Sequence, residues 1–327
     1  MDDGITIRPL READAEAVVE LYAKAAAVEP RLGPVTLPQW SQFLKLPQNR
    51  GGRDFRVAER DGLLCGLAES SLRDQGAHHS RFLKIVVAPE MRRHRIGLAL
   101  FDEVLAIDAD PGLTVQTLVS SDWPAGMAFV AAFGFVHVES EIGMKCVEPL
   151  QPARTLAAAR ATIEQVSDVT ACAGEVARIH NAAYASDAAF RLYSPEEMAQ
   201  VLTESEVWIA SEDGQMSGFC LTESERNSMW IESVAVDPVR QGRGLGQLLV
   251  YRVLAAHDVS IEHPCWLNVS SRNAPALKIY RRLGFRAPAR DLPLQRHARR
   301  IDRRARAAVS VEPCSTSPTT ANLGPSP

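Results

Sequence analysis

The glycine-rich hexapeptide Gln241–Gly246 (QGRGLG) is the stretch of this sequence best suited to chemistry. It follows an apolar run, Met229–Val236, and precedes apolar residues at helical spacing: Leu245, Leu248, Leu249, Val253 and Ala256. This order predicts a strand, a tight turn and a helix. The free N–H groups of a helix N-terminus bind phosphate, and glycine lets the backbone approach a ligand closely. The turn therefore predicts a phosphate site; a tight turn without a ligand is the alternative.

Two common phosphate motifs do not fit this turn. The dinucleotide fingerprint GxGxxG would need glycine at position 247, where the chain has Gln247. The P-loop would need Gly-Lys-Ser/Thr after its glycines, and none follows. What remains is a strand, a Val-x-Pro step at Val236–Pro238 and the glycine turn, with N–H groups that suit a pyrophosphate.

The sequence carries this pattern twice. Lys84–Leu100 (KIVVAPEMRRHRIGLAL) corresponds to Glu232–Leu249, and Val119–Phe135 matches Val269–Phe285 at an offset of 150 positions. Because a repeat of this length is a whole domain, we predict two tandem copies of one fold.

The repeat divides the chain into four parts. Copy one spans residues 1–150 and copy two spans residues 160–290, with two prolines near the joint. Residues 291–309 are rich in arginine, and their apolar residues at helical spacing predict a solvated helix. Residues 310–327 are rich in Ser, Thr and Pro and predict a disordered tail.

Local signals in copy two predict alternating strands and helices. Ser194 and Glu197 predict a capping box at the start of a helix, and Asp213-Gly214 predicts a hairpin turn. Gly284 suits the left-handed position that ends a helix. We therefore expect an α/β protein in which each copy is a mixed, mostly antiparallel sheet flanked by helices.

With its flanks, the turn resembles the GNAT acetyltransferase superfamily. Val236–Gly246 matches that family's acetyl-CoA pyrophosphate motif, and Leu267–Phe285 matches its second motif. The resemblance covers essentially the whole chain and implies two tandem GNAT folds. It also implies an acyltransferase that moves an acetyl group from acetyl-CoA to a primary amine and needs no metal.

The resemblance implies roles for individual residues. A bulged strand pairs its backbone with pantetheine and the thioester oxygen through Val234, Ala235 and Val236. The pyrophosphate contacts are Gln241, Gly242, Arg243, Gly244, Leu245 and Gly246. Asn273 contacts the cofactor arm, and Tyr280 protonates the leaving sulfur. Tyr280 also shares a helix face with Leu277 and Leu283, so a packing role is its alternative.

An acetyl acceptor needs a base, because a free alkyl ammonium titrates near pH 10 and only the neutral amine attacks. Glu232 is the candidate, because several GNAT enzymes carry a base four residues before the position of Val236. An exposed strand glutamate is the alternative reading. Glu223, Glu225 and His180 remain open as bases.

Copy one departs from the motif at each chemical position. Its turn carries Arg95 where glycine is expected, and Val130 and Trp123 stand at the positions of the tyrosine and the asparagine. Leu83 and Lys84 replace Glu232 and its neighbour. We therefore expect the active site in copy two and a structural or substrate-shaping role for copy one.

Composition narrows the class of protein further. A net charge of −4 gives no electrostatic footprint for nucleic acid. The sequence contains no run of 18 apolar residues, so we expect no membrane span. Six scattered cysteines without a CxxC pair favour reduced thiols in a cytoplasmic protein. We expect a monomer or homodimer whose acceptor is an amino sugar, an antibiotic or a mycothiol precursor. A protein N-terminal or lysine acetyltransferase and a non-catalytic CoA-binding regulator are the alternatives.

Overall fold

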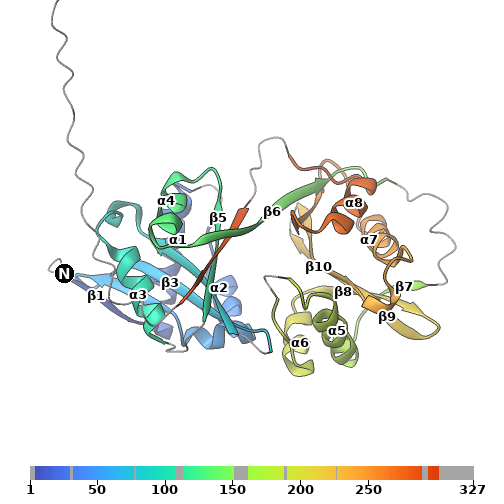
Figure 1. Cartoon of the computed structure of the whole chain (residues 1–327), viewed down its shortest axis with the longest axis horizontal. Helices are drawn as coiled ribbons and strands as arrows, with labels where there is room; N and C mark the ends of the chain where they lie inside the picture. The colour runs from blue at the N-terminus through green and yellow to red at the C-terminus, as the bar shows by residue number, and fades with distance from the viewer. Residues whose placement is uncertain are drawn as a thin grey trace, which may run out of the picture.

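The two halves of the chain lie side by side and share one sheet (Figure 1). The structure is a computed structural model that describes residues 4–29, 32–76, 79–107, 113–150, 161–187, 190–225, 227–288 and 294–301. Within these residues the strand order is β1-β2-β3-β4-β5-β12-β6-β11-β10-β9-β8-β7. Neighbouring strands are antiparallel except in two places, one in each copy, so the sheet is mixed and mostly antiparallel, as predicted.

Copy one begins the sheet and carries two pairs of helices. Its elements are β1 (Ile5–Pro9), α1 (Ala15–Ala26), α2 (Leu37–Lys45), β2 (Arg56–Arg60), β3 (Leu63–Asp74), β4 (His79–Val87), α3 (Ile96–Ile107), β5 (Thr114–Ser120), α4 (Pro124–Ala132) and β6 (Val136–Cys146). Helices α1 and α2 pack on one face of the strands through Val18, Leu21 and Trp40. Helix α3 packs on the other face through Leu100 and Phe101.

Copy two repeats this order. Its elements are β7 (Thr162–Val166), α5 (Val169–Ala183), α6 (Pro195–Leu202), β8 (Glu206–Glu212), β9 (Gln215–Glu225), β10 (Ser228–Val236), α7 (Leu245–Ala256), β11 (Cys265–Ser270), α8 (Ala274–Arg282) and β12 (Leu294–Arg300). Helices α5 and α6 pack on the face that carries Val207 and Phe219. Helices α7 and α8 cover the opposite face, which carries Cys220, Met229 and Leu267.

The local signals of copy two are confirmed. The Ser194 side chain accepts the backbone N–H of Glu197, and the Glu197 side chain accepts the backbone N–H of Ser194, so both ends of the capping box are made. Asp213 and Gly214 both have positive φ, as a tight hairpin turn requires. Gly284 has φ +98° at the end of α8, where a Cβ would lie 2.4 Å from the carbonyl oxygen of Glu148.

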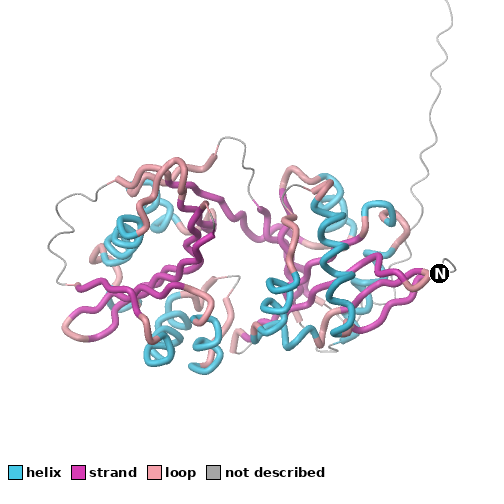
Figure 2. Tube along the Cα trace, turned by 180° about the vertical axis from the view of Figure 1, so that it is seen from behind, coloured by secondary structure: helices cyan, strands magenta, loops and turns pink. Residues whose placement is uncertain are grey.

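The last strands of the two copies join the halves, which the sequence did not predict. Strand β6 leaves copy one and pairs with β11 of copy two, while β12 returns from copy two and lies between β5 and β6. Seen from behind, the strands run from one half into the other (Figure 2). The two copies are therefore parts of one continuous structure.

Strand β12 corrects the prediction of an arginine-rich helix at residues 291–309. Residues 294–300 are a strand with a hydrogen-bonded neighbour on each side, so tertiary pairing outweighs the helical spacing of the apolar residues. Arg296 is 3% exposed and lies 3.3 Å from a Glu139 carboxylate oxygen, and it also pairs with Glu141. The rest of that predicted helix and the predicted tail at 310–327 lie largely outside the described residues. No helix in the described part of the chain is long and apolar enough to cross a membrane.

Candidate active site

A gap opens in copy two where two neighbouring strands part. Strands β10 and β11 are parallel partners at Met229–Ile231 and Cys265–Leu267, and within the described residues this pairing goes no further. On its other side β10 has a bulge against β9 between Ile231 and Ser233, which makes Glu232 the extra residue. A bulge leaves backbone groups without a ladder partner and re-aims the strand.

The backbone of Val234, directly after the bulge, faces this gap. Its N–H and its C=O are not taken up by a strand; both contact the hydroxyl of Tyr184, at the end of α5. Ala235 and Val236 continue β10 in register with β9. A chain segment or an extended ligand that entered the gap would meet the same two groups of Val234. The bulge that the family resemblance implied is present, and the pantetheine contact of Val234 stays a prediction.

The glycine turn lies at the end of β10 and the start of α7. Gly242 and Gly244 have φ of +78° and +85°, and Gly244 is the N-cap of the helix. The turn is exposed at Gln241, Gly242 and Arg243, and Leu245 is buried beneath it. The Gln241 side chain donates to the carbonyl oxygen of Val236 over 3.1 Å. Exposed N–H groups at a helix start form an anion site, so the turn fits a pyrophosphate.

An ion pair braces the strand before the turn. Asp237 is buried, accepts the backbone N–H of Val239 and pairs with Arg178 of α5 at 2.8 Å. The hydrogen bond from Arg178 lowers the pKa of Asp237 below its usual value, so the carboxylate stays ionised. The turn is thereby tied to the helix that carries Tyr184.

Asn273 and Tyr280 both lie on α8 and line the same cavity. Asn273 is the N-cap, and its side chain accepts the N–H of Ala276 at 3.1 Å, so part of its role is structural. Tyr280 is partly buried, and its ring packs against Phe285 with centroids 5.6 Å apart. Burial raises the pKa of Tyr280 above the ordinary tyrosine value, so the hydroxyl keeps its proton at neutral pH.

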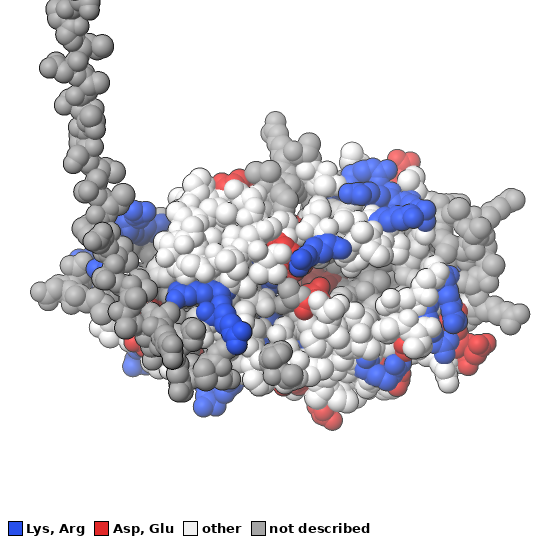
Figure 3. Space-filling model, viewed as in Figure 1, with Lys and Arg blue, Asp and Glu red and all other residues white. Residues whose placement is uncertain are grey.

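A cavity of about 1120 Å³ lies between the two halves. Copy one contributes α2 and β6, and copy two contributes α5, α6, α8 and the parting strands. Most of the charged residues that line it are acidic: Glu139, Glu141, Asp187, Glu204, Glu206, Glu223 and Glu232, with Arg191 as the cation. Acidic atoms are visible in the hollow between the halves (Figure 3). Glu139 and Glu141 already pair with Arg296, and the excess of the other carboxylates over Arg191 favours a cationic ligand such as an ammonium group.

The predicted bases occupy different surroundings. Glu232 and Glu223 are exposed carboxylates in the cavity wall, on neighbouring strands. His180 also lines the cavity, but burial lowers its pKa, and its ring stacks on Phe190 with centroids 6.2 Å apart. Glu225 is the last residue of β9. The arrangement brings Glu232, Glu223 and His180 to the cavity that Tyr280 and Val234 share.

Tyr184 is the site residue that sequence reasoning missed. It follows α5 in sequence and contacts Val234 fifty positions further along the chain. The sequence carries no local signal for such a contact, because it depends on how α5 packs against β10.

Copy one has the same strands, but within the described residues β4 has no bulge against β3. Strands β3 and β4 pair without interruption from Gly66 with Val87 to Asp74 with His79, so there is no bulge there. Near the equivalent position of β4, Tyr22 of α1 donates to buried Glu69 of β3, and the Lys84 ammonium lies 4.5 Å from the Tyr22 ring centroid. The position of Tyr280 is taken by Val130, which is buried.

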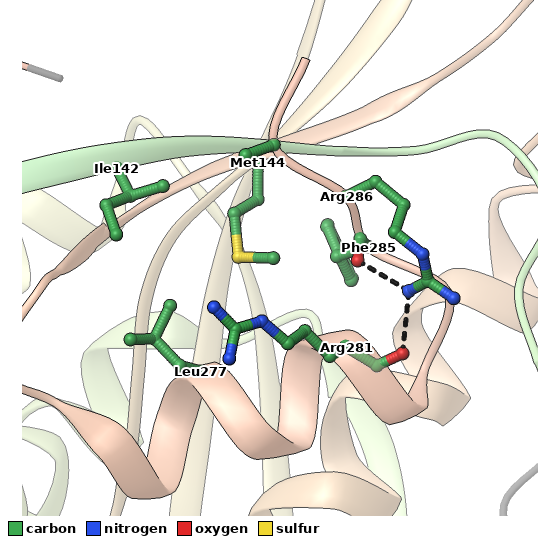
Figure 4. A pocket seen from close by; sticks show the side chains of 7 residues that line it. Ile142, Met144, Leu277, Arg281, Phe285 and Arg286 are labelled. Carbon is green, nitrogen blue, oxygen red and sulfur yellow. Dashed lines mark hydrogen bonds between the residues drawn. The ribbon is translucent and has the colours of Figure 1, made fainter. Parts of the chain in front are cut away.

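A second, smaller pocket of about 330 Å³ lies where β6 meets α8 (Figure 4). Ile142, Met144, Leu277 and Phe285 give it an apolar wall. Arg286 folds over its rim and donates to the carbonyl oxygens of Arg281 and Phe285, at 2.8 Å each. This pocket lies at the joint between the copies, and none of the predicted catalytic residues lines it.

Comparison with known proteins agrees with this geometry. The acetyltransferase (GNAT) family model matches residues 16–135 and again residues 175–285. The chain belongs to this family, with two GNAT domains in tandem, and it is an acyltransferase. GNAT enzymes use acetyl-CoA as the acyl donor.

Curated relatives share the length of the chain as well as its family. A mycothiol acetyltransferase of Actinosynnema mirum is 27% identical over 285 residues, which cover 83% of this chain and 92% of the relative. A mycothiol acetyltransferase of Thermobifida fusca is 28% identical over 306 residues and is covered to 91%.

Solved structures share the fold. A tandem GNAT protein from the clavulanic acid biosynthesis pathway superposes with a TM-score of 0.65 at 18% identity, covering 90% of this chain and 98% of its own. A GCN5-related N-acetyltransferase from Sphaerobacter thermophilus gives a TM-score of 0.64 at 18% identity, covering 92% and 98%. The tandem architecture predicted from the repeat is confirmed.

Proposed function

We propose that this protein transfers the acetyl group of acetyl-CoA to a primary amine of a small molecule, and that copy two carries the reaction. The proposal rests on the bulge in β10 and on Val234 beside it, whose backbone N–H and C=O contact Tyr184 and not a neighbouring strand. Copy one lacks this bulge: β4 pairs with β3 in continuous register, so the part of β4 that leaves β5 is not re-aimed as β10 is.

Different residues of copy two bind different parts of acetyl-CoA. The turn from Gln241 to Gly246 holds the pyrophosphate through its N–H groups, and Val234 to Val236 pair with the pantetheine arm. Asn273 lies beside that arm at the start of α8. These contacts fix the thioester in the gap between β10 and β11, which is where proximity to the acceptor lowers the barrier.

Proton transfers complete the reaction. Glu232 removes a proton from the acceptor ammonium, directly or through a water molecule, and leaves a neutral nucleophile. The N–H of Val234 donates to the thioester oxygen as negative charge develops on it. Tyr280, which is protonated at neutral pH, donates its proton to the departing sulfur.

The acceptor is a small cationic molecule. The cavity is bounded by both copies, which favours a compact ligand, and most of the charged residues that line it are carboxylates, which attract an ammonium. The relatives named mycothiol acetyltransferases support a mycothiol precursor as the first acceptor to test, followed by amino sugars and antibiotics with primary amines.

A release assay for free CoA thiol tests the proposal. Acetyl-CoA is incubated with the protein and with one acceptor at a time: the amine precursor of mycothiol, amino sugars, aminoglycosides, and peptides with a free N-terminus or lysine. We expect thiol release with a small amine and little with the peptides. Release with peptides alone would identify a protein acetyltransferase. Acetyl-CoA binding without release for any amine would identify a regulatory CoA-binding protein.

A further inference from the structure

The hydroxyl of Tyr184 makes three contacts at the point where the strands part. It donates to the carbonyl oxygen of Val234 at 2.7 Å and accepts the N–H of the same residue at 3.2 Å. The Ser233 hydroxyl lies 3.1 Å away on the other side. Tyr184 also lines the cavity, so its hydroxyl lies between the bulged strand and the acceptor space.

From this geometry we infer that Tyr184 is a catalytic residue, and that its hydroxyl and the N–H of Val234 together donate to the thioester oxygen in the transition state. The inference rests on the proposed transfer in copy two. The two donor atoms are 3.2 Å apart, so one oxygen can lie within ordinary hydrogen-bond distance of both. Without substrate, the N–H of Val234 donates to the Tyr184 hydroxyl; when a thioester oxygen lies beside both groups, the two donors turn to that oxygen instead.

The direction of the hydroxyl proton changes with the charge of its acceptors. In the structure it goes to a neutral carbonyl, that of Val234. A thioester oxygen that becomes negative is a much stronger acceptor, since charge-assisted hydrogen bonds are about twice as strong as neutral ones. Burial raises the pKa of Tyr184, so the proton is present to be donated throughout the neutral range.

The chemical step is balanced without any further reagent. The lone pair of the neutral amine forms the new N–C bond, and the π pair of the C=O bond moves to the oxygen that Tyr184 and Val234 hold. When this pair returns, the C–S bond breaks and its electrons leave with the sulfur, which takes the proton of Tyr280. Glu232 passes its first proton to solvent, the amine nitrogen then loses its second proton to Glu232 or to water, and Tyr280 regains a proton from solvent. Tyr184 donates a hydrogen bond throughout and is not itself deprotonated.

Tyr184→Phe tests the inference, because it removes the hydroxyl and keeps the ring beside His180. We expect kcat to fall by about a hundredfold to a thousandfold, the usual loss for one oxyanion donor. Acetyl-CoA affinity, measured by titration calorimetry without an acceptor, should change by less than about threefold, because the charge develops only during the reaction. Hydrolysis of acetyl-CoA by water passes through the same oxyanion and should fall with kcat.

Tyr251→Phe is the matched control, since it removes a tyrosine hydroxyl from α7, outside the cavity; it should leave kcat unchanged. If Tyr184 merely occupies the gap in the unliganded protein, Tyr184→Phe will bind acetyl-CoA about tenfold more tightly and keep its kcat, and the inference is wrong. If wild type neither binds acetyl-CoA nor turns it over, the proposed function fails and Tyr184 loses its role with it. A Tyr184→Phe rate within threefold of an active wild type refutes the inference alone.

Discussion

The turns that follow β4 and β10 have the same backbone and different side chains. Arg93 and Arg95 have φ of +69° and +60°, where Gly242 and Gly244 have +78° and +85°. Even the supporting contact is repeated: Arg92 donates to the carbonyl oxygen of Val87 over 3.2 Å, as Gln241 does to that of Val236. The strand-to-helix junction therefore sets the turn, and glycine is not needed to form it.

The comparison shows what glycine and the bulge contribute. A non-glycine residue in the left-handed region costs roughly 1–2 kcal/mol, which copy one tolerates twice. What copy one lacks is the bulge: β4 and β10 leave their parallel partners at equivalent residues, Phe82 and Ile231, but only β10 has a register shift against its other neighbour. The fold can thus keep the turn without the bulge.

The largest expected effect concerns β12, the strand of copy two that lies between β5 and β6 of copy one. Arg296→Met leaves Glu139, which is 7% exposed, without its buried cation. We expect the free energy of unfolding to fall by about 3–5 kcal/mol, as for one partner removed from a buried pair. Urea denaturation measures it, with the exposed Arg300→Met as the control, expected within about 0.5 kcal/mol of wild type. Equal midpoints for the two variants would mean that β12 does not hold the copies together.

The next prediction compares one tyrosine from each copy: Tyr280, expected to control turnover, and Tyr22, expected to control stability. Tyr280→Phe should lower turnover by about a hundredfold, the scale for a lost general acid, and leave the melting temperature almost unchanged. Tyr22→Phe removes the hydrogen bond to buried Glu69 and should instead cost about 1–3 kcal/mol of stability without changing kcat. Steady-state kinetics and melting curves of both variants test these two expectations. A Tyr280→Phe rate within threefold of wild type, at unchanged stability, would leave Tyr280 as a packing residue.

The smallest effect restores the glycines of copy one. In the double variant Arg93→Gly and Arg95→Gly, relief of left-handed strain is opposed by the greater freedom of glycine in the unfolded chain. We expect stability to stay within about 1 kcal/mol of wild type and no additional acetyl-CoA to bind, because β4 still has no bulge. A second bound acetyl-CoA in this variant would show that the turn alone makes a site.

The features that sequence predicted are those with local causes. The capping box at Ser194, the hairpin turn at Asp213 and the left-handed Gly284 each follow from neighbouring residues. The repeat revealed the tandem fold because the same local pattern recurs at an offset of about 150 positions. The exchange of β6 and β12 and the contact of Tyr184 with Val234 depend on packing between distant segments, which no spacing along the chain encodes.

Acetyl-CoA stoichiometry in matched variants of the two turns tests the central claim, that copy two alone holds the acyl donor. Titration calorimetry compares wild type with Gly244→Glu and with Arg95→Glu, which places the same charge at the equivalent position of copy one. We expect one acetyl-CoA per chain for wild type and for Arg95→Glu, and none for a folded Gly244→Glu. Two per chain in wild type, or binding that survives Gly244→Glu and is lost in Arg95→Glu, would contradict it.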